Sequence, residues 1–193
     1  MNTHSYQNLV IEVFDDPAYQ SASSDNTFNY SKQYSSVDEG YQPTSKHGIK
    51  IYQNGKEWSN CIILGSGGGT GIYDNSSLVA DGQLLVCCAD NIFCLSLPDL
   101  NLKWNTRVDD ATCFQIYNLQ EDYVVHGELA ISRIDVNGNI KWQFGGSDIF
   151  VTLDDEEAFT LNSDYIALID FNKARYKVDF NGKTIAHQDD YQG

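Results

Sequence analysis

A histidine and a carboxylate lie close together in the middle of the chain, at His126 and Glu128 on either side of a glycine. A histidine beside a carboxylate can transfer protons or bind a metal ion. With nearby tyrosines, the pair could also line a polar cleft for a small ligand or a carbohydrate, or serve a hydrolase. The other three histidines show no metal-ligand spacing, and the sequence has no Cys-x-x-Cys motif. We therefore interpret His126 as a turn histidine bonded to its neighbours, and we predict no metal site.

A second candidate is the glycine-rich stretch at residues 65–71, which reads Gly-Ser-Gly-Gly-Gly-Thr-Gly. Loops of this kind can surround a phosphate group when a helix begins directly after them, and a phosphate loop also needs a lysine. Here a turn-like segment, residues 72–77, follows without lysine or helix. We interpret the stretch as a flexible or tightly turned connection between sheets, although its backbone could approach a partner closely. The sequence also has no Gly-x-Ser-x-Gly elbow, so a serine nucleophile has no local support.

Acidic residues form two groups that could bind a partner. Asp109 and Asp110 make up the first, and the second contains Asp154, Asp155, Glu156 and Glu157. Neither group has the alternating aspartate pattern of a calcium loop. We interpret both as solvated loop charges that lie in connections between structural units. Such a placement would gather negative charge on one side of the molecule, where it could attract a basic protein.

The overall charge supports the same class of partner. The chain has 27 acidic residues against 12 lysines and arginines, a formal net charge of -15 and a pI near 4.3. Nucleic acids and anionic membranes are therefore poor partners, because phosphate binding needs clustered basic residues. An equally simple interpretation is that the acidity keeps a β-rich protein soluble.

Cysteine placement and the N-terminus indicate the compartment. The five cysteines lie mostly inside predicted strands, as buried thiols do in a reducing environment. The first residues lack the basic and apolar regions of a signal peptide, and no apolar run approaches the roughly 18 residues of a membrane helix. We therefore expect a cytoplasmic protein.

These candidate residues belong to a repeated pattern of short strands. Residues 122–142 read as two apolar strands, an Asn-Gly turn and a third strand, and residues 83–104 and 164–185 repeat this order imperfectly. The units start 39 and 42 residues apart, and Trp104 and Trp142 lie 38 residues apart. A period of about 40 residues with three or four strands is typical of a β-propeller blade. Residues 77–80, 112–117 and 158–161 would add one strand to each unit.

The rest of the chain supplies fewer regular elements. We expect a strand at residues 9–14, an irregular polar segment at 18–47, and a hairpin formed by 49–52 and 61–64. We divide the chain into an N-terminal part, residues 1–48, and a blade-like repeat region, residues 49–193, within one domain. Because closed propellers usually need four to eight blades, we predict an all-β fold: an incomplete or open stack of three to four antiparallel blade-like sheets. Residues 175–180 alternate in polarity, so the last sheet should have one wet face.

The units resemble the repeats of the quinoprotein family, the pyrroloquinoline-quinone-type propellers. Residues 131–142, Ile-Ser-Arg-Ile-Asp-Val-Asn-Gly-Asn-Ile-Lys-Trp, match the family's strand, turn and terminal tryptophan, and residues 95–104 match with Pro-Asp-Leu in the turn. The resemblance covers roughly residues 77–187 and implies that Trp104 and Trp142 dock neighbouring blades. Family enzymes hold their quinone in the channel of a complete ring, which this chain is too short to build, so we expect no cofactor.

Some family enzymes place adjacent cysteines beside the quinone, and this chain has Cys87 next to Cys88. Inside a strand, neighbouring side chains point to opposite faces. We therefore do not expect the two thiols to act as a redox pair.

These observations favour a non-catalytic, acidic interaction module that binds a basic protein. An immunity-type inhibitor of a basic toxin, such as a nuclease, is one concrete form. The alternative is a small-ligand or carbohydrate binding protein, or a hydrolase, with a polar cleft near His126 and Glu128. Self-association that completes a propeller is a third possibility.

Overall fold

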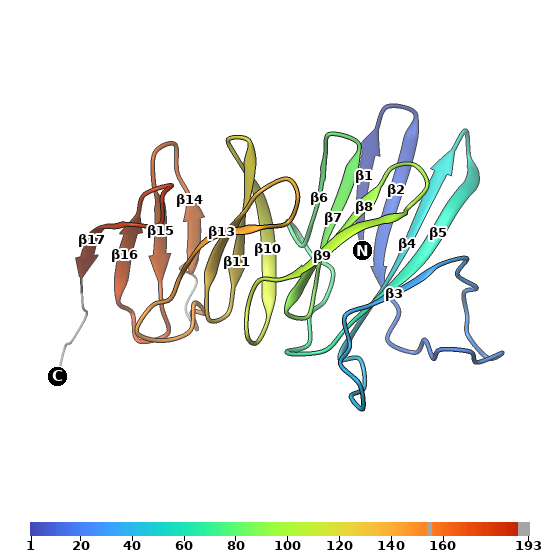
Figure 1. The fold of residues 1–193 in the computed structure, drawn as a ribbon, viewed down its shortest axis with the longest axis horizontal. Helices are drawn as coiled ribbons and strands as arrows, with labels where there is room; N and C mark the ends of the chain where they lie inside the picture. Colours follow the sequence, from blue (N-terminus) through green and yellow to red (C-terminus); the bar gives the residue numbers. More distant parts are fainter. Residues whose placement is uncertain (154–155, 189–193) are drawn as a thin grey trace.

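Four β-sheets stand side by side in one row in the computed structural model, which describes residues 1–153 and 156–188 (Figure 1). Sheet A contains β1 (Asn2–Tyr6), β2 (Leu9–Asp15), β3 (Gln33–Ser35), β4 (Ser45–Gln53) and β5 (Lys56–Gly65) in the order β1-β2-β4-β5-β3. Sheet B contains β6 (Ser77–Ala80), β7 (Gln83–Cys88), β8 (Asn91–Ser96) and β9 (Leu102–Arg107). Sheet C contains β10 (Cys113–Leu119), β11 (Asp122–Gly127), β12 (Ile131–Ile134) and β13 (Ile140–Phe144). Sheet D contains β14 (Phe159–Leu161), β15 (Ile166–Ile169), β16 (Arg175–Val178) and β17 (Thr184–Gln188).

Sheets B, C and D each have four antiparallel strands that follow one another in chain order. This meander is the arrangement of a propeller blade. The three predicted repeat units correspond to these three sheets, and the row is open, with sheets A and D at its two ends (Figure 1). The prediction of an all-β, open and propeller-like stack is therefore confirmed.

The hydrophobic core consists of three layers, one between each pair of neighbouring sheets. Most strands of sheets B and C are apolar on both faces, because each of these sheets packs against two neighbours. Cys88 belongs to the layer between sheets A and B, and Cys87 to the layer between sheets B and C. The two thiols thus point to opposite faces, as their adjacent positions in a strand predict.

Residues before the repeats form more structure than the sequence predicts. β1 was not predicted, β3 lies inside the segment expected to be irregular, and β4 starts at Ser45, so the expected boundary at residue 48 falls within a strand. β3 is only three residues long and pairs in parallel with β5. Its short, polar sequence has no sustained period, which explains why the pattern did not reveal it.

The outer face of sheet A is covered by this N-terminal segment. Phe28 contacts Phe14 edge-on at 5.3 Å between ring centroids, and the Lys50 ammonium lies 4.1 Å from the centroid of the Phe28 ring. The Tyr30 hydroxyl donates a 2.7 Å hydrogen bond to Asp16. A Cβ atom at Gly48 would collide with Tyr30 and Phe14, so glycine allows this close approach.

Tryptophans join the later sheets. Trp104 donates from Nε1 to the Val136 carbonyl at 3.1 Å, and Trp142 donates in the same way to the Phe180 carbonyl at 2.9 Å. Each ring lies over the glycine of an Asn-Gly turn in the next sheet, where an added Cβ would stand 2.6 Å from Trp104 or 2.8 Å from Trp142. These glycines also have φ near +80°, a conformation that other residues rarely adopt. The Asn-Gly turn therefore shapes the hairpin and makes room for the preceding tryptophan.

Among the described residues, no helix has the length and apolar character needed to cross a membrane.

Candidate functional site: the acidic connection edge

The segments that link successive sheets gather at one edge of the stack, the lower edge in Figure 1. We call this surface the connection edge and define it as residues 66–76, 108–112, 128–130, 145–153 and 156–158. Backbone hydrogen bonds tie its segments together, from Gly68 to Ala111 (2.8 Å), from Glu128 to Thr112 (2.7 Å) and from Phe150 to Glu128 (2.7 Å). The connections between sheets contain Asp109, Asp110, Glu156 and Glu157, as the sequence analysis expected.

Asp109 does not have the solvated position that we expected. Its side chain is buried, and its two carboxylate oxygens accept hydrogen bonds of 2.7–3.1 Å from four backbone N–H groups. These donors belong to Ala111, Thr112, Leu129 and Ala130, which lie in two different segments of the connection edge. A buried carboxylate is stable in this position because it accepts hydrogen bonds from all four of these N–H groups. Asp109 therefore holds two segments of the connection edge together.

Other acidic side chains remain on the surface of the connection edge. Asp74, Asp110, Glu156 and Glu157 are exposed, and Glu128 and Asp148 are half-buried. Asp110 has an 86% exposed side chain and lies 3.6 Å from Arg107, while Glu156 forms a bidentate pair with Arg175 at 2.7 and 2.9 Å. Asp154 and Asp155 lie outside the described residues. Acidic groups from three successive connections therefore share one edge.

His126 is located in the interior between sheets C and D. Its Nε2 donates to the Phe150 carbonyl at 2.9 Å, Nδ1 lies 3.1 Å from the Gln115 side-chain amide, and the ring stacks on Phe159. Burial lowers the pKa of His126 to about 4, and the raising effects of the Phe150 contact and Asp109 are smaller. Glu128 contributes its backbone to the connection edge. The structure therefore places the histidine in a bonded, neutral state, as the interpretation of a neighbour-bonded histidine anticipated, although it lies in a strand.

The glycine-rich stretch is a tightly packed connection between sheets A and B. A Cβ at Gly68 would overlap the Thr112 side chain, and a Cβ at Gly65 would stand 2.7 Å from the Cys88 carbonyl oxygen. Two of its glycines are therefore required by the close approach of neighbouring chain segments. This agrees with the interpretation of a tight turn between sheets.

A chain of polar contacts that the sequence did not reveal holds this stretch to sheet A. His47 Nδ1 lies 2.9 Å from Asp15 Oδ1, and His47 Nε2 lies 3.2 Å from the Thr70 hydroxyl. The order resembles a catalytic triad, but the Thr70 hydroxyl also accepts from the Ala89 N–H at 3.0 Å and contacts Ser45 at 2.9 Å. The imidazole is fully buried. Contact with His47 lowers the pKa of Asp15 against the effect of partial burial. Because its hydroxyl already has these partners, Thr70 holds the glycine-rich stretch to sheet A.

A second unforeseen cluster lies between sheets C and D. Arg133 is buried and contacts Asp122 at 2.6 Å, the Phe180 carbonyl at 2.6 Å and the Gln120 side chain at 3.1 Å. Lys141 adds a 2.7 Å contact to Asp122. Burial would raise the pKa of Asp122, but Lys141 and Arg133 together outweigh it and lower that pKa. The Phe180 carbonyl accepts from both Arg133 and Trp142, so one atom of sheet D is held by two donors of sheet C.

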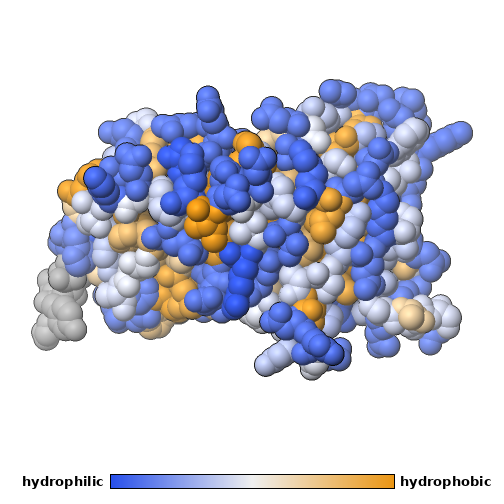
Figure 2. Space-filling view, in the orientation of Figure 1, coloured by the Kyte–Doolittle hydropathy of each residue, from blue (hydrophilic) through white to orange (hydrophobic). Residues whose placement is uncertain are grey.

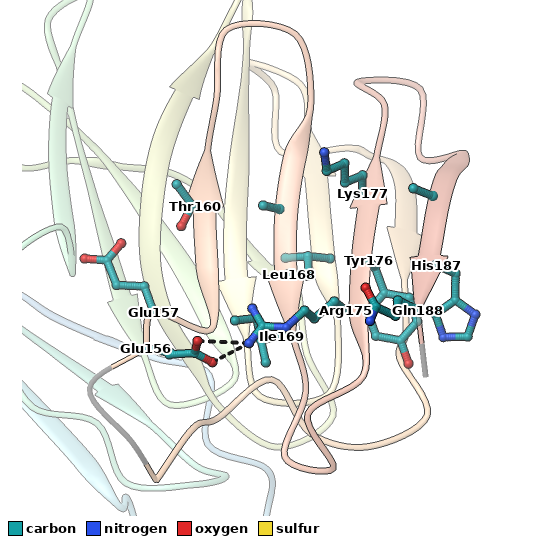
Figure 3. Close-up of a pocket in the computed structure, with 12 residues that line it drawn as sticks. Glu156, Glu157, Thr160, Leu168, Ile169, Arg175, Tyr176, Lys177, His187 and Gln188 are labelled. Atoms are coloured by element: carbon teal, nitrogen blue, oxygen red, sulfur yellow. Dashed lines mark hydrogen bonds and ion pairs between the residues drawn. The ribbon is translucent and has the colours of Figure 1, made fainter. Parts of the chain in front are cut away.

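The outer face of sheet D carries a shallow hollow of about 720 Å³ (Figure 3). Thr160, Ala167 and Ala186 form its centre, and Arg175 and Lys177 project from β16. The β16 side chains alternate between exposed and buried, which agrees with the expected wet face.

No protein-family model matches this chain, and no curated protein matches it. Solved structures are similar to it in fold. The computationally designed Ika8 protein aligns with a TM-score of 0.50 at 10% identity, over 77% of this chain and 47% of its own. The AfRom2 CNH domain gives 0.49 at 14% identity, over 77% and 49%, and the Neurospora crassa Pan2 WD40 domain gives 0.48 at 13% identity, over 60% and 37%.

The similarity concerns the fold only. This chain spans less than half of each of these solved chains. Together with the four sheets in a row, the comparison describes an all-β, propeller-like architecture, a type of scaffold that supports many functions.

Proposed function

We propose that this chain is a non-catalytic protein-interaction module whose connection edge binds a basic protein. The observation that carries the proposal is the gathering of exposed acidic side chains from three successive connections on this edge. The backbone bonds between the connections hold these charges in place before a partner arrives. A net charge of -15 adds long-range attraction for a positively charged surface. Much of the remaining surface is hydrophilic on the side shown in Figure 2.

The specific form that we propose is an immunity-type inhibitor, held in the cytoplasm to neutralise a basic toxin such as a nuclease. Such a toxin has a positively charged site for its nucleic acid, and an acidic edge can occupy that site in place of phosphates. We also propose that the units descend from quinoprotein-type repeats. The tryptophans that dock onto the turns of the next sheet support this relation.

Affinity capture from the native host tests the interaction. The wild-type chain should retain a basic protein at low salt and release it as salt rises, because screening weakens contacts between exposed charges. The variant D74K/D110K should lose that protein. The matched control E121K/D164K makes the same change in net charge at the opposite edge, where both residues are exposed, and should retain it. Equal loss from both variants would show that net charge, and not this edge, determines binding.

A second experiment tests the inhibitor directly. The chain and the captured basic protein should be expressed together and separately in a bacterial host. Toxicity of the partner that the wild-type chain relieves and D74K/D110K does not would establish the inhibitory role. A captured partner that is harmless by itself would exclude it.

The alternative function, ligand binding or hydrolysis near His126 and Glu128, has a separate test. The His126 ring is 7% exposed and its nitrogens contact Phe150 and Gln115, which favours a structural role. The interaction module predicts that E128Q folds like the wild type and loses little binding to the captured protein, because Glu128 is half-buried and is one of several acidic side chains on the edge. A ligand or hydrolytic activity found in a substrate screen and abolished by E128Q would favour the alternative.

A further inference from the structure

Sheet D presents a broad face that the described part of the chain leaves uncovered. Sheets B and C pack on both faces, and the outer face of sheet A is covered around Phe28 and Tyr30. Sheet D packs on sheet C through its inner face, which includes Phe159, Leu168 and Tyr176. Its other face forms the hollow shown in Figure 3.

The centre of this face is made of small side chains. Thr160 pairs with Ala167, Ala167 with Lys177, and Lys177 with Ala186, so one row crosses all four strands. Only Lys177 in this row is long. Small side chains allow a second sheet to pack at about 10 Å, the usual spacing between stacked sheets.

The charged side chains that the structure describes on this face are of both signs. Arg175 is already paired with Glu156. Lys177 lies over the Tyr165 ring at 4.9 Å, and among the described residues no carboxylate pairs with it. Glu157 is exposed and lies beside β14, across the hollow from Lys177 on β16 (Figure 3). In the described part of the chain, the face therefore carries one positive and one negative charge without an ion-pair partner, Lys177 on β16 and Glu157 beside β14.

Two exposed apolar side chains lie next to the hollow on sheet D. Leu153 is 84% exposed and Phe171 is 43% exposed, and both line a smaller hollow that shares Ile169 and Glu156 with the first. Exposed apolar groups of this size gain free energy when a partner covers them.

We propose that the outer face of sheet D binds the same face of a second copy of this chain. A twofold axis in the plane of contact, passing midway between Lys177 and Glu157, brings Lys177 of each copy opposite Glu157 of the other. Such a self-complementary arrangement is what a twofold interface requires. Two copies that each carry a net charge of -15 repel one another at most orientations. A face that carries charges of both signs is where the two copies can approach.

The face is modest in size, so we expect a weak, reversible interaction. Four strands about 4.8 Å apart form a modest face, at the lower end of specific interfaces. We therefore expect a dissociation constant on the order of 10 µM. The dimer face shares Glu156 and Glu157 with the connection edge. The two proposals remain distinguishable, because the charges that test the basic partner, Asp74 and Asp110, belong to earlier connections that the dimer face does not include.

Sedimentation velocity of the full chain at concentrations from about tenfold below to tenfold above this value tests the dimer. The wild type should change from monomer to dimer. K177E and E157K should each raise the dissociation constant at least tenfold, because each places like charges opposite one another. The double variant K177E/E157K exchanges the two charges and should restore dimerisation. The control K56E makes the same charge change as K177E at the exposed first residue of β5 in sheet A and should dimerise like the wild type.

A186R provides a steric test, because a long side chain in the small central row would prevent close packing of the sheets. Circular dichroism would verify that each variant is folded. A wild type that stays monomeric at all these concentrations would overturn the proposal. A dimer unaffected by K177E, E157K and A186R would also overturn it, since the contact would then lie elsewhere. Loss of the basic partner by D74K/D110K with dimerisation intact would show that the two surfaces act separately.

Discussion

The two ends of the stack are stabilised in different ways. Sheet A joins sheet B through a continuous apolar layer, and its outer face is covered by aromatic side chains of the N-terminal segment. Sheet D joins sheet C through an apolar layer that also contains polar contacts from His126, Arg133 and Trp142 to backbone carbonyls. Its outer face is not covered by described residues. In a row of sheets, each end sheet packs against a single neighbour. The contacts in that one interface therefore determine how a mutation or a change in pH affects the stability of the end sheet.

Both ends contain a buried histidine, but His47 contacts Asp15 and holds the glycine-rich stretch, whereas His126 and Arg133 lie in the junction of sheets C and D. We therefore expect the junction of sheet D to respond to charge and pH more than the junction of sheet A. Apolar burial is nearly independent of pH, whereas buried histidine and arginine contacts depend on protonation and on complete pairing. Hydrogen exchange resolved by strand can compare β14–β17 with β1–β5 in each experiment below.

The largest expected effect comes from R133M. This change removes the contacts to Asp122 and Phe180 and leaves a buried carboxylate with Lys141 as its remaining charged partner, so we expect a loss of about 3–5 kcal/mol in the free energy of unfolding. The control R175M removes an exposed arginine that pairs with the exposed Glu156 at 2.7 Å, and should cost about 1 kcal/mol or less. Denaturant unfolding measures both. Equal losses would show that the buried cluster has no special role at the D end.

Acidification should also loosen the D end. The pKa of His126 is about 4 in the folded chain and near 6.5 when unfolded, so the unfolded state binds more protons between these values. Stability is therefore complete above pH 6.5 and falls as the pH drops toward 4, by about 3 kcal/mol for this group. The variant H126Q should show a smaller loss over the same range. Exchange that rises equally in sheets A and D on acidification would contradict the comparison.

Tryptophan truncation should distinguish the ends as well. Trp142 is partly buried and donates to Phe180 at 2.9 Å, so W142A should cost about 2–3 kcal/mol and raise exchange in β14–β17 first. Trp58 is 56% exposed and its contact to Asp99 is 3.4 Å long. W58A should therefore cost less than about 1 kcal/mol. A larger effect from W58A would indicate that sheet A relies on its tryptophan more than on its apolar layer.

The smallest effect is expected at the cover of sheet A. Y30F removes the hydroxyl that donates to Asp16 and lies next to Gly48, while keeping the aromatic ring. We expect a loss of about 1 kcal/mol. Exchange should rise around residues 28–35 and stay unchanged in sheet D. A global destabilisation would show that the cover is essential for the whole stack.

The sequence predicted the elements that follow a repeated period. Sheets B, C and D, the Asn-Gly turns and the hairpin of β4 and β5 all follow from alternating or continuous apolar runs between turn residues. β1 and β3 escaped because their residues are polar. β1 pairs with the adjacent β2 in a hairpin, whereas β3 pairs with β5, with Gln33 opposite Ile62, so its partner is distant in the sequence. Local pattern carries no information about such partners.

The candidate site was only partly predictable for a related reason. The sequence indicated acidic groups in the connections, but it could not show that Asp109 turns inward to bind four N–H groups. The contact of Asp15 with His47 and that of Arg133 with Phe180 join residues 32 and 47 positions apart. These clusters form only after neighbouring sheets have packed. Their residues have no distinguishing spacing beforehand.

The tryptophan that rests on the turn of the following sheet has a consequence for how such chains change in length. Residues 105–142 contain one turn glycine, Gly138, that receives a preceding tryptophan, and one tryptophan, Trp142, that the next turn receives. A tandem duplication of this segment would create an extra sheet whose two new junctions are both complete. Gene duplication in steps of one unit can therefore lengthen or shorten the row while every tryptophan keeps a turn glycine to rest on, whereas a deletion that separates Gly138 from Trp142 would leave one junction unmatched.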